Sequence, residues 1–450
     1  MPTREDYEQQ LDSFDATERQ EALESLVEKA NTGEIKLPPV GDQFNLHCHS
    51  FYSFNGYGYS PASLAWRGRT AGLCAMGLID FDVLDGVDEF LNACSMLGLR
   101  CGAGLETRVF VSDFAGDEIN SPGEPGIAYH IGAGFTSSTV TGREGVLLQG
   151  LKAMAQQRTQ TVLERVNTLL EEIALTFAED VLPLTPAGNV TERHLCTAYY
   201  EKARALFQNP QDRAQYWAKK LDMPAEKIAE TLNDPPVFQG ILRGKTMKAG
   251  GVGYVKAQGD EFPSPEAVNE LVLSNGAIPT FAFLDGTSPG EAKMDELLDC
   301  MTASGVAAVN IIPDRNWNIA DAAVKEQKLN NLEAFVQHAR NRALPIFVGT
   351  EMNAYGQRFV DKLDAPELQP YFSDFQEGMY ILHGHTVLQA NAEMGYLSDW
   401  AAESFATTRD KNRFFVRFGK ALPPEMTTNL ESLTPEMTPK AILQVLAKYS

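Results

Sequence analysis

The 450-residue sequence has several shortages, and each excludes a class of protein. No run of about 18 apolar residues occurs, so no transmembrane helix is expected. Residues 1–10 are polar and acidic, which is not the pattern of a signal peptide. The six cysteines form no CxxC pair, and their spacing predicts reduced thiols in a cytoplasmic protein.

Basic residues are also few, because 38 Lys and Arg stand against 60 Asp and Glu, for a formal net charge of -22. A surface of this sign repels nucleic-acid phosphates, so we expect neither a nucleic-acid partner nor a membrane partner. Hydrophobic residues make up 44% of the chain, which excludes disorder over most of its length. The sequence does not indicate an oligomeric state.

The chain alternates short apolar runs with helical patterns, which favours a parallel sheet or an α/β barrel. The alternation begins near residue 44 and resumes near residue 254. The predicted strands are 44–46, 74–79, 100–104, 278–283, 307–312, 345–349 and a last apolar strand at 379–382. Ser60-Pro61 and Ser264-Pro265 each predict a helix start, with serine as the cap and proline in the first turn.

Between residues 151 and 232 this alternation stops, and apolar residues follow a helical period instead. We therefore predict one barrel interrupted by an insertion, not three independent domains. The predicted parts are a helical extension at 1–40, the barrel at 41–150 and 251–395, a helical insertion at 151–250 and a helical tail at 396–450.

Histidine is scarce, with seven residues, so its positions are informative. His47 and His49 directly follow a predicted strand, and residues two apart on a strand point to the same side. Two imidazoles on one side suit a transition-metal ion, and in parallel barrels the C-terminal strand ends carry the active site. The alternative is a pair of histidines in an exposed loop.

Asp80 and Asp82, Glu106, and Glu351 with Asn353 also follow predicted strands, and His130 lies in the run 129–132. A single carboxylate of this kind is often a solvated loop residue or a helix cap, and Asp82 in particular fits a cap. Together with His47 and His49, these make five such positions in chain order, which favours a shared site. His383 and His385 form a second HxH pair, which either adds ligands on the same barrel face or bonds locally.

These motifs resemble the PHP (polymerase and histidinol phosphatase) superfamily of metal-dependent phosphoesterases. The first motif, HxHxxxS, corresponds to residues 47–53, and the third, GxE, to 104–106. The second corresponds to 79–82, the next histidine to His130, and the late GSDxH motif to 349–353. The resemblance implies a distorted (β/α)7 barrel with seven parallel strands and a metal cluster at their C-terminal ends.

The sequence also departs from the family pattern. Phe81 and Phe283 stand where the family has histidine ligands, and Glu351 and Asn353 replace its late aspartate and histidine. The resemblance implies a first metal held by the four residues His47, His49, Glu106 and Glu351. It implies at most a weaker second metal, held by Glu106 and His130. The ion expected is zinc, manganese or iron. The ring of Phe81 is expected near this site, in the place of a lost ligand.

Two functions remain open from the sequence. The first is a PHP-type metal-dependent hydrolase of a small phosphorylated metabolite, in which a metal-bound water loses a proton and attacks phosphorus. Asp80 is the candidate for orienting that water or accepting its proton, and Arg315, Arg358 and Asn353 are candidates for substrate contact. The alternative is a degenerate PHP-like protein that binds a ligand or partner without turnover.

Overall fold

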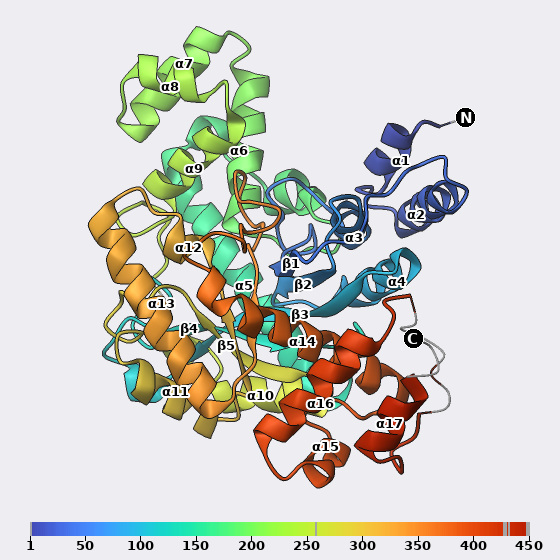
Figure 1. The fold of residues 1–450 in the computed structure, drawn as a ribbon. Helices are drawn as coiled ribbons and strands as arrows, with labels where there is room; N and C mark the ends of the chain where they lie inside the picture. The colour runs from blue at the N-terminus through green and yellow to red at the C-terminus, as the bar shows by residue number, and fades with distance from the viewer. Residues whose placement is uncertain (1, 257–258, 426–429, 431–432, 447–450) are drawn as a thin grey trace. The chain divides into compact units, whose positions relative to one another are not determined.

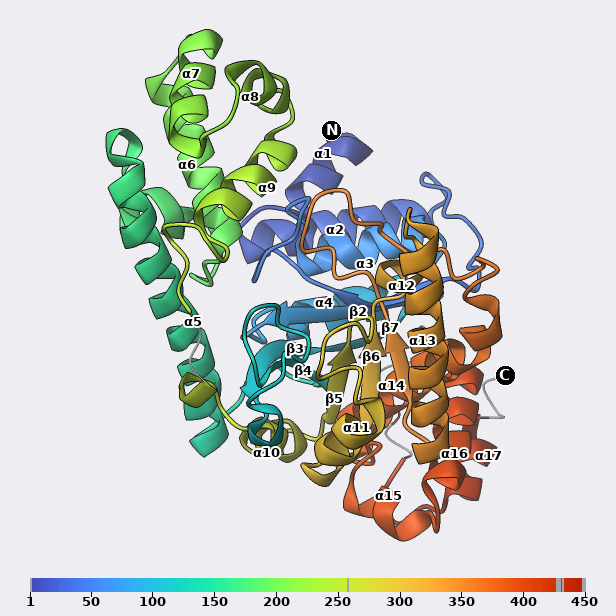
Figure 2. The ribbon, with the colours of Figure 1, turned by 90° about the vertical axis from the view of Figure 1, so that its left-hand side faces the viewer.

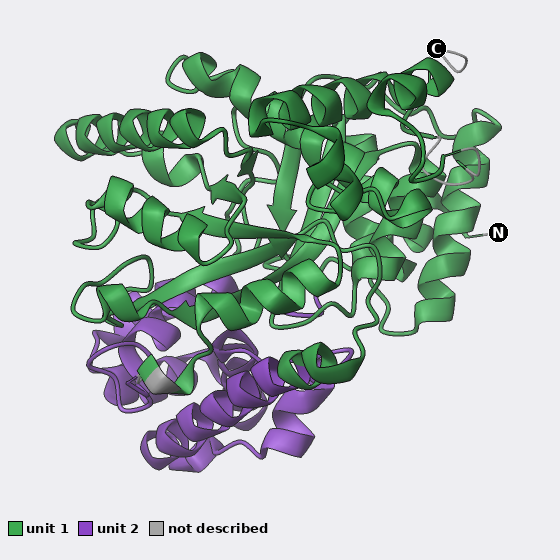
Figure 3. Cartoon of the chain, turned by 90° about the horizontal axis from the view of Figure 1, so that it is seen from below, with its two compact units in different colours: residues 1–50, 55–148, 259–450 green, residues 51–54, 149–258 purple. Residues whose placement is uncertain are grey.

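The computed structural model describes residues 2–256, 259–425, 430 and 433–446. The chain divides into two compact units (Figure 3). The first unit comprises residues 1–50, 55–148 and 259–450, and the second comprises 51–54 and 149–258. The predicted insertion at 151–250 corresponds to most of the second unit, which additionally takes up the short segment 51–54.

The first unit is built around one seven-stranded sheet whose strands follow chain order. They are β1 (Phe44–Cys48), β2 (Ala75–Phe81), β3 (Arg100–Phe110), β4 (Ile127–Ala133), β5 (Ile278–Phe283), β6 (Ala308–Ile311) and β7 (Ile346–Val348). A bridge between Cys48 and Glu351 joins the first strand to the segment after the last one. The sheet is therefore a nearly closed, distorted barrel, and the predicted fold class is confirmed.

The expected parallel arrangement is wrong at one strand. Among the strands of the described residues, β4 runs antiparallel to both of its neighbours, β3 and β5, while the other pairs are parallel. Only residues 111–126 connect the long strand β3 to β4. A connection with a single short turn of helix supports a hairpin-like return, whereas a parallel strand needs a helical crossover.

Helices cover the barrel strands of the first unit (Figures 1 and 2). The principal ones are α3 (Pro61–Thr70), α4 (Val87–Leu97), α10 (Pro265–Ser274), α11 (Met294–Ala303), α13 (Ala322–Arg342), α14 (Phe372–Ala392) and α16 (Thr408–Ala421). Shorter or peripheral ones are α1 (Arg4–Gln10), α2 (Ala16–Asn31), α12 (Asp314–Trp317), α15 (Asp399–Ser404) and α17 (Pro439–Leu446). Both predicted serine caps are confirmed, because Ser60 and Ser264 each accept a backbone N–H at the start of α3 and α10.

The predicted strand at 379–382 is wrong, because these residues lie inside α14. This helix is buried on most of its circumference, so its apolar residues form a continuous run without the one-sided period of a surface helix. A short apolar run of this kind does not distinguish a buried strand from a buried helix. His383 and His385 therefore lie in the middle of a helix and not at a strand end.

The second unit is helical and has a hydrophobic core of its own, which includes the buried side chains of Tyr199, Trp217 and Phe238. Its elements are most of α5 (Gly142–Leu169), α6 (Glu192–Leu206), α7 (Pro210–Leu221), α8 (Ala225–Thr231) and α9 (Pro235–Thr246). In the segment 51–54, the ring of Phe54 packs edge-on against His194 of α6, with ring centroids 5.0 Å apart. His194 is thus a packing residue.

None of the helices in the described part of the chain combines the length and the apolar character that a membrane crossing requires.

Candidate metal centre

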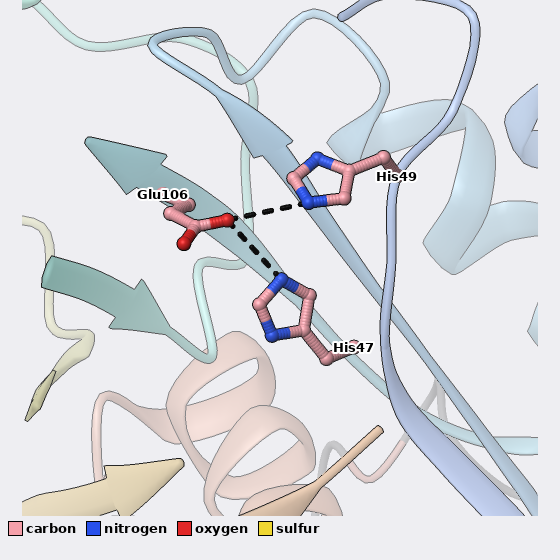
Figure 4. A group of neighbouring side chains, drawn as sticks. All are labelled: His47, His49 and Glu106. Carbon is pink, nitrogen blue, oxygen red and sulfur yellow. Dashed lines mark ion pairs between the residues drawn. The ribbon is translucent and has the colours of Figure 1, made fainter. Parts of the chain in front are cut away.

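Three residues predicted as metal ligands meet: His47 near the end of β1, His49 just after it, and Glu106 in the second half of β3. Glu106 Oε2 lies 3.3 Å from His47 Nε2 and 3.2 Å from His49 Nε2. Figure 4 shows both rings directed at this one carboxylate oxygen. Among the described His, Cys, Asp and Glu side chains, these form the one group of three whose ligand atoms all lie within 4.8 Å of one another.

The three side chains are buried, so water screens their charges little and the charges interact strongly. Burial alone would raise the pKa of Glu106, but contacts with His47 and His49 lower it to about 2. Burial lowers the pKa of His47, but Glu106 and Glu351 outweigh burial and raise it above the usual value. Glu106 is therefore ionised at neutral pH, and its negative charge favours a bound cation.

The residues present fit a divalent metal ion. His47 Nε2 and Glu106 Oε2 are buried and make no hydrogen bond, although a buried polar atom normally has a partner. Two imidazole nitrogens and one carboxylate oxygen form a donor set that zinc sites of hydrolases use, with a position left open. The same set also suits manganese or iron.

A side chain on β6 fixes the orientation of His47. Asn310 on β6 is buried, and its Oδ1 lies 3.0 Å from His47 Nδ1. With Nδ1–H donating to this oxygen, the lone pair of Nε2 faces Glu106. Asn310 was not predicted from the sequence as a site residue. The available signal was an asparagine inside the apolar run 307–312, where a buried amide needs a partner.

Two predicted residues on β2 lie beside the centre. Asp80 is buried and accepts hydrogen bonds from the backbone N–H and the hydroxyl of Ser50, at 2.7 and 2.6 Å. It thus anchors the residue that follows His49. Phe81 stacks on the ring of His49 with centroids 4.1 Å apart, which confirms its expected position near the site.

Glu351 lies next to the three ligands, but its carboxylate is directed elsewhere. Its backbone N–H donates to His47 O at 2.8 Å, and its O accepts from His49 N at 2.7 Å. Its side chain instead accepts from Arg315 at 2.8 Å and from Gln357 at 3.2 Å. Glu351 has a left-handed φ of 64°, which is unusual outside glycine and is typical of functional loops.

The structure does not bring His130 to the centre. Its Nε2 lies 2.6 Å from Asn269 Oδ1 on α10. Because β4 is antiparallel, Ile131 and not His130 pairs with Glu106, so the histidine ring faces the outer helix layer. Phe283 also faces outward, because it stacks on Phe335 of α13 at 3.8 Å. The structure therefore does not form the expected second-metal position from Glu106 and His130.

The remaining candidates have separate partners. Arg315 pairs with Glu351, whereas Arg358 pairs with Asp314 at 3.2 Å and lies over the ring of Trp317. Asn353 is half-buried two residues after Glu351.

The second HxH pair supplies no ligands to this centre and bonds to the backbone. His383 Nδ1 accepts from Cys101 N, and His385 bridges Gly134 O and Tyr396 N. Of the two expectations for this pair, bonding outside the site is the one observed.

Comparisons with known proteins give few relatives. No protein-family model matches the chain, and no curated protein sequence matches it. One similar solved structure is an amidohydrolase from Chromobacterium violaceum with bound sulfate and no metal, at 16% identity and a TM-score of 0.48. The similarity covers 75% of this chain and 96% of that one. Another is a candidate metal-dependent phosphoesterase from Bifidobacterium adolescentis, at 18% identity, a TM-score of 0.46, and coverage of 75% and 98%.

Proposed function

We propose that the chain is a PHP-type metal-dependent hydrolase that acts on a small phosphorylated metabolite. The observation that carries this proposal is the convergence of His47, His49 and Glu106 in a buried group, at the C-terminal end of β1 and in the second half of β3. Parallel barrels place their catalytic groups at this end. A protein without metal chemistry has no physical need to bury one carboxylate against two imidazoles.

His47, His49 and Glu106 would hold one divalent ion, zinc, manganese or iron. When bound, the ion would lower the pKa of a coordinated water and polarise a phosphoryl oxygen. Asn310 holds His47 in the tautomer that presents Nε2, and the Asp80–Ser50 contact holds the loop after His49. In this proposal Asp80 is a positioning residue. Both of its carboxylate oxygens accept hydrogen bonds from Ser50, which fixes the residue that follows His49.

We propose a single firmly held ion. Phe81 covers one face of His49, and His130 is bonded to Asn269, so neither position supports another ion. Glu351 is the fourth ligand in this proposal through Oε1, while Oε2 keeps its contacts with Arg315 and Gln357. Its backbone is already hydrogen-bonded to both His47 and His49, which holds the carboxylate beside the three ligands.

The test combines metal analysis with a substrate screen. Elemental analysis of the purified protein should find close to one divalent ion per chain. A screen of phosphorylated metabolites with added manganese or zinc should find turnover that the Glu106→Gln variant lacks. Three ions at full occupancy would contradict the ligand assignment. One ion without turnover of any phosphorylated compound would favour a protein that binds without catalysis.

A further inference from the structure

A second arginine lies on the same face of β3 as Glu106. Arg108 follows Glu106 by two residues, and side chains two apart on a strand point to the same face. Arg108 pairs in register with Tyr129 of β4, as Glu106 pairs with Ile131. Arg108, Tyr129 and Glu106 therefore share the inner face of the sheet. The sequence analysis considered neither Arg108 nor Tyr129.

Arg108 is held in position by a buried carboxylate. Its Nη1 donates to Glu124 Oε2 at 2.9 Å, and the same oxygen accepts from the Ser121 hydroxyl at 2.7 Å. The guanidinium lies 4.7 Å from the centroid of the Phe262 ring. The Arg108 side chain nevertheless keeps 24% of its surface exposed, whereas that of Glu124 keeps 7%. The carboxylate thus orients a cation that solvent still reaches.

Arg315, on another element, is likewise paired with a nearly buried carboxylate. It follows β6, and its guanidinium pairs at 2.8 Å with Glu351, whose side chain is 8% exposed, while its own side chain is 44% exposed. A purely structural ion pair looks different in this chain, because the Arg19 side chain, bonded to Glu89, is only 1% exposed. Both site arginines therefore combine a buried carboxylate partner with a side chain that is partly exposed.

Tyr129 connects the two arginines with the centre. Burial raises the pKa of its hydroxyl, Arg108 opposes this, and the carboxylates of Glu106, Glu124 and Glu351 add to it. Glu351 raises the pKa of Arg315 most, and the hydroxyl of Tyr129 and the carboxylate of Glu106 raise it further. The hydroxyl of Tyr129 therefore lies within electrostatic range of Arg108, Arg315 and Glu106.

We propose that Arg108, Tyr129 and Arg315 form an anion-recognition group that makes this centre specific for phosphomonoester dianions. The proposal rests on the proposed hydrolase function and names the substrate class of the same site. A guanidinium presents a planar fork of N–H donors that matches phosphoryl oxygens, and a tyrosine hydroxyl adds one more donor. Neutral esters, lactones and amides carry no charge that would balance two arginines, and a phosphodiester carries only one.

The direct test measures the binding of inorganic phosphate to the metal-loaded protein by calorimetry. Arg108→Gln and Arg315→Gln should each weaken phosphate binding about tenfold to hundredfold, because each removes a charge-assisted contact. The metal content should stay at the wild-type value. Arg143→Gln is the matched control, since Arg143 lies in the same unit, 74% exposed and paired with Glu270 on the surface. Phosphate affinity that is unchanged in Arg108→Gln would overturn the proposal.

A paired variant guards against a misfolded protein. Removing Arg108 alone leaves Glu124 buried without its cation, which destabilises the fold. Arg108→Gln with Glu124→Gln removes both charges, so it should keep the wild-type unfolding temperature and still lose phosphate affinity. If this variant binds phosphate normally, the arginine is structural and the proposal is wrong.

Kinetics separate this proposal from the proposed function. With p-nitrophenyl phosphate and bis(p-nitrophenyl) phosphate as probes, the wild type should prefer the monoester. Arg108→Gln should lower kcat/KM for the monoester about tenfold or more and change the diester much less. Monoester turnover unaffected by Arg108→Gln would overturn the anion group and leave the hydrolase function standing. Phosphate binding that depends on Arg108, without turnover of any phosphomonoester, would overturn the hydrolase function alone.

Discussion

At the scale of single residues, the centre depends on one carboxylate shared by two imidazoles. Glu106→Gln keeps nearly the same size but removes the charge that attracts a cation. We expect divalent-metal affinity to fall by more than the roughly 10- to 100-fold that losing an outer partner costs. Titration with zinc or manganese measures this change. The circular-dichroism spectrum should stay native, because apolar strand layers stabilise a barrel. Global unfolding of the variant would show a structural role instead.

Asn310 permits a finer residue-scale prediction. Asn310→Ala removes the acceptor for His47 Nδ1, so the ring loses its fixed tautomer and orientation. We expect metal affinity to fall about 10- to 100-fold. Asn310→Asp keeps an acceptor of the same size and should retain most of the affinity. If both variants bind metal equally weakly, the loss comes from packing and not from the hydrogen bond to His47.

The residues that could be predicted from the sequence are those whose geometry is local. His47 and His49 are two residues apart at a strand end, and Glu106 directly follows an apolar run, so their common direction could be inferred. His130 could not be placed, because its direction depends on the reversal of β4. Asn310 and Arg108 were missed because their roles depend on contacts with other strands.

At the scale of elements, six of the seven barrel strands were predictable, whereas β4 and the covering helix α14 were not. Strands flanked by serine-capped helices produce a clear alternation. In α14 the run 379–382 is apolar because the helix is buried against its neighbours, including β7. Gly378 allows this closeness, since a Cβ there would lie 2.0 Å from Ile346 O. No local pattern in the sequence reports such a contact between helix and strand.

This contact leads to a stability prediction. Gly378→Ala improves helix propensity by up to about 1 kcal/mol, but the added carbon meets a backbone oxygen that has little room to move. Overpacking costs about 1–3 kcal/mol, so we expect net destabilisation, measured as a lower urea midpoint. Gly240→Ala in α9 is the matched control, because no atom lies within 4 Å of its added carbon. That control should be neutral or stabilising.

At the scale of the whole molecule, the acidic composition and the buried histidines have different consequences. The net charge of -22 was known from the sequence and does not choose a fold. By contrast, folding lowers the pKa values of three buried histidines of the first unit that lie outside the centre. Burial lowers the pKa of His130 to about 4, of His383 to about 3 and of His385 to about 4. These side chains stabilise the fold only while they are neutral.

Acid should therefore destabilise the first unit through these histidines. Their folded pKa values lie below the unfolded value of about 6.5, so between pH 6.5 and 4 the unfolded chain binds more protons. Their contribution is complete above pH 6.5 and is lost as the pH falls toward 4. Two carboxyls act in the opposite direction, because burial raises the pKa of Asp82 to about 6 and of Glu291 to about 7.

A single variant isolates the histidine contribution from these carboxyls. His385 donates through Nε2 to Gly134 O and accepts at Nδ1 from Tyr396 N, so protonation of Nδ1 breaks the second bond. His385→Gln removes the titrating group. Between pH 7 and 4.5, the wild type should lose on the order of 2 kcal/mol more of its free energy of unfolding than the variant loses. Urea unfolding of both proteins across this range measures the difference. Parallel pH dependences would show that His385 is not held neutral by the fold.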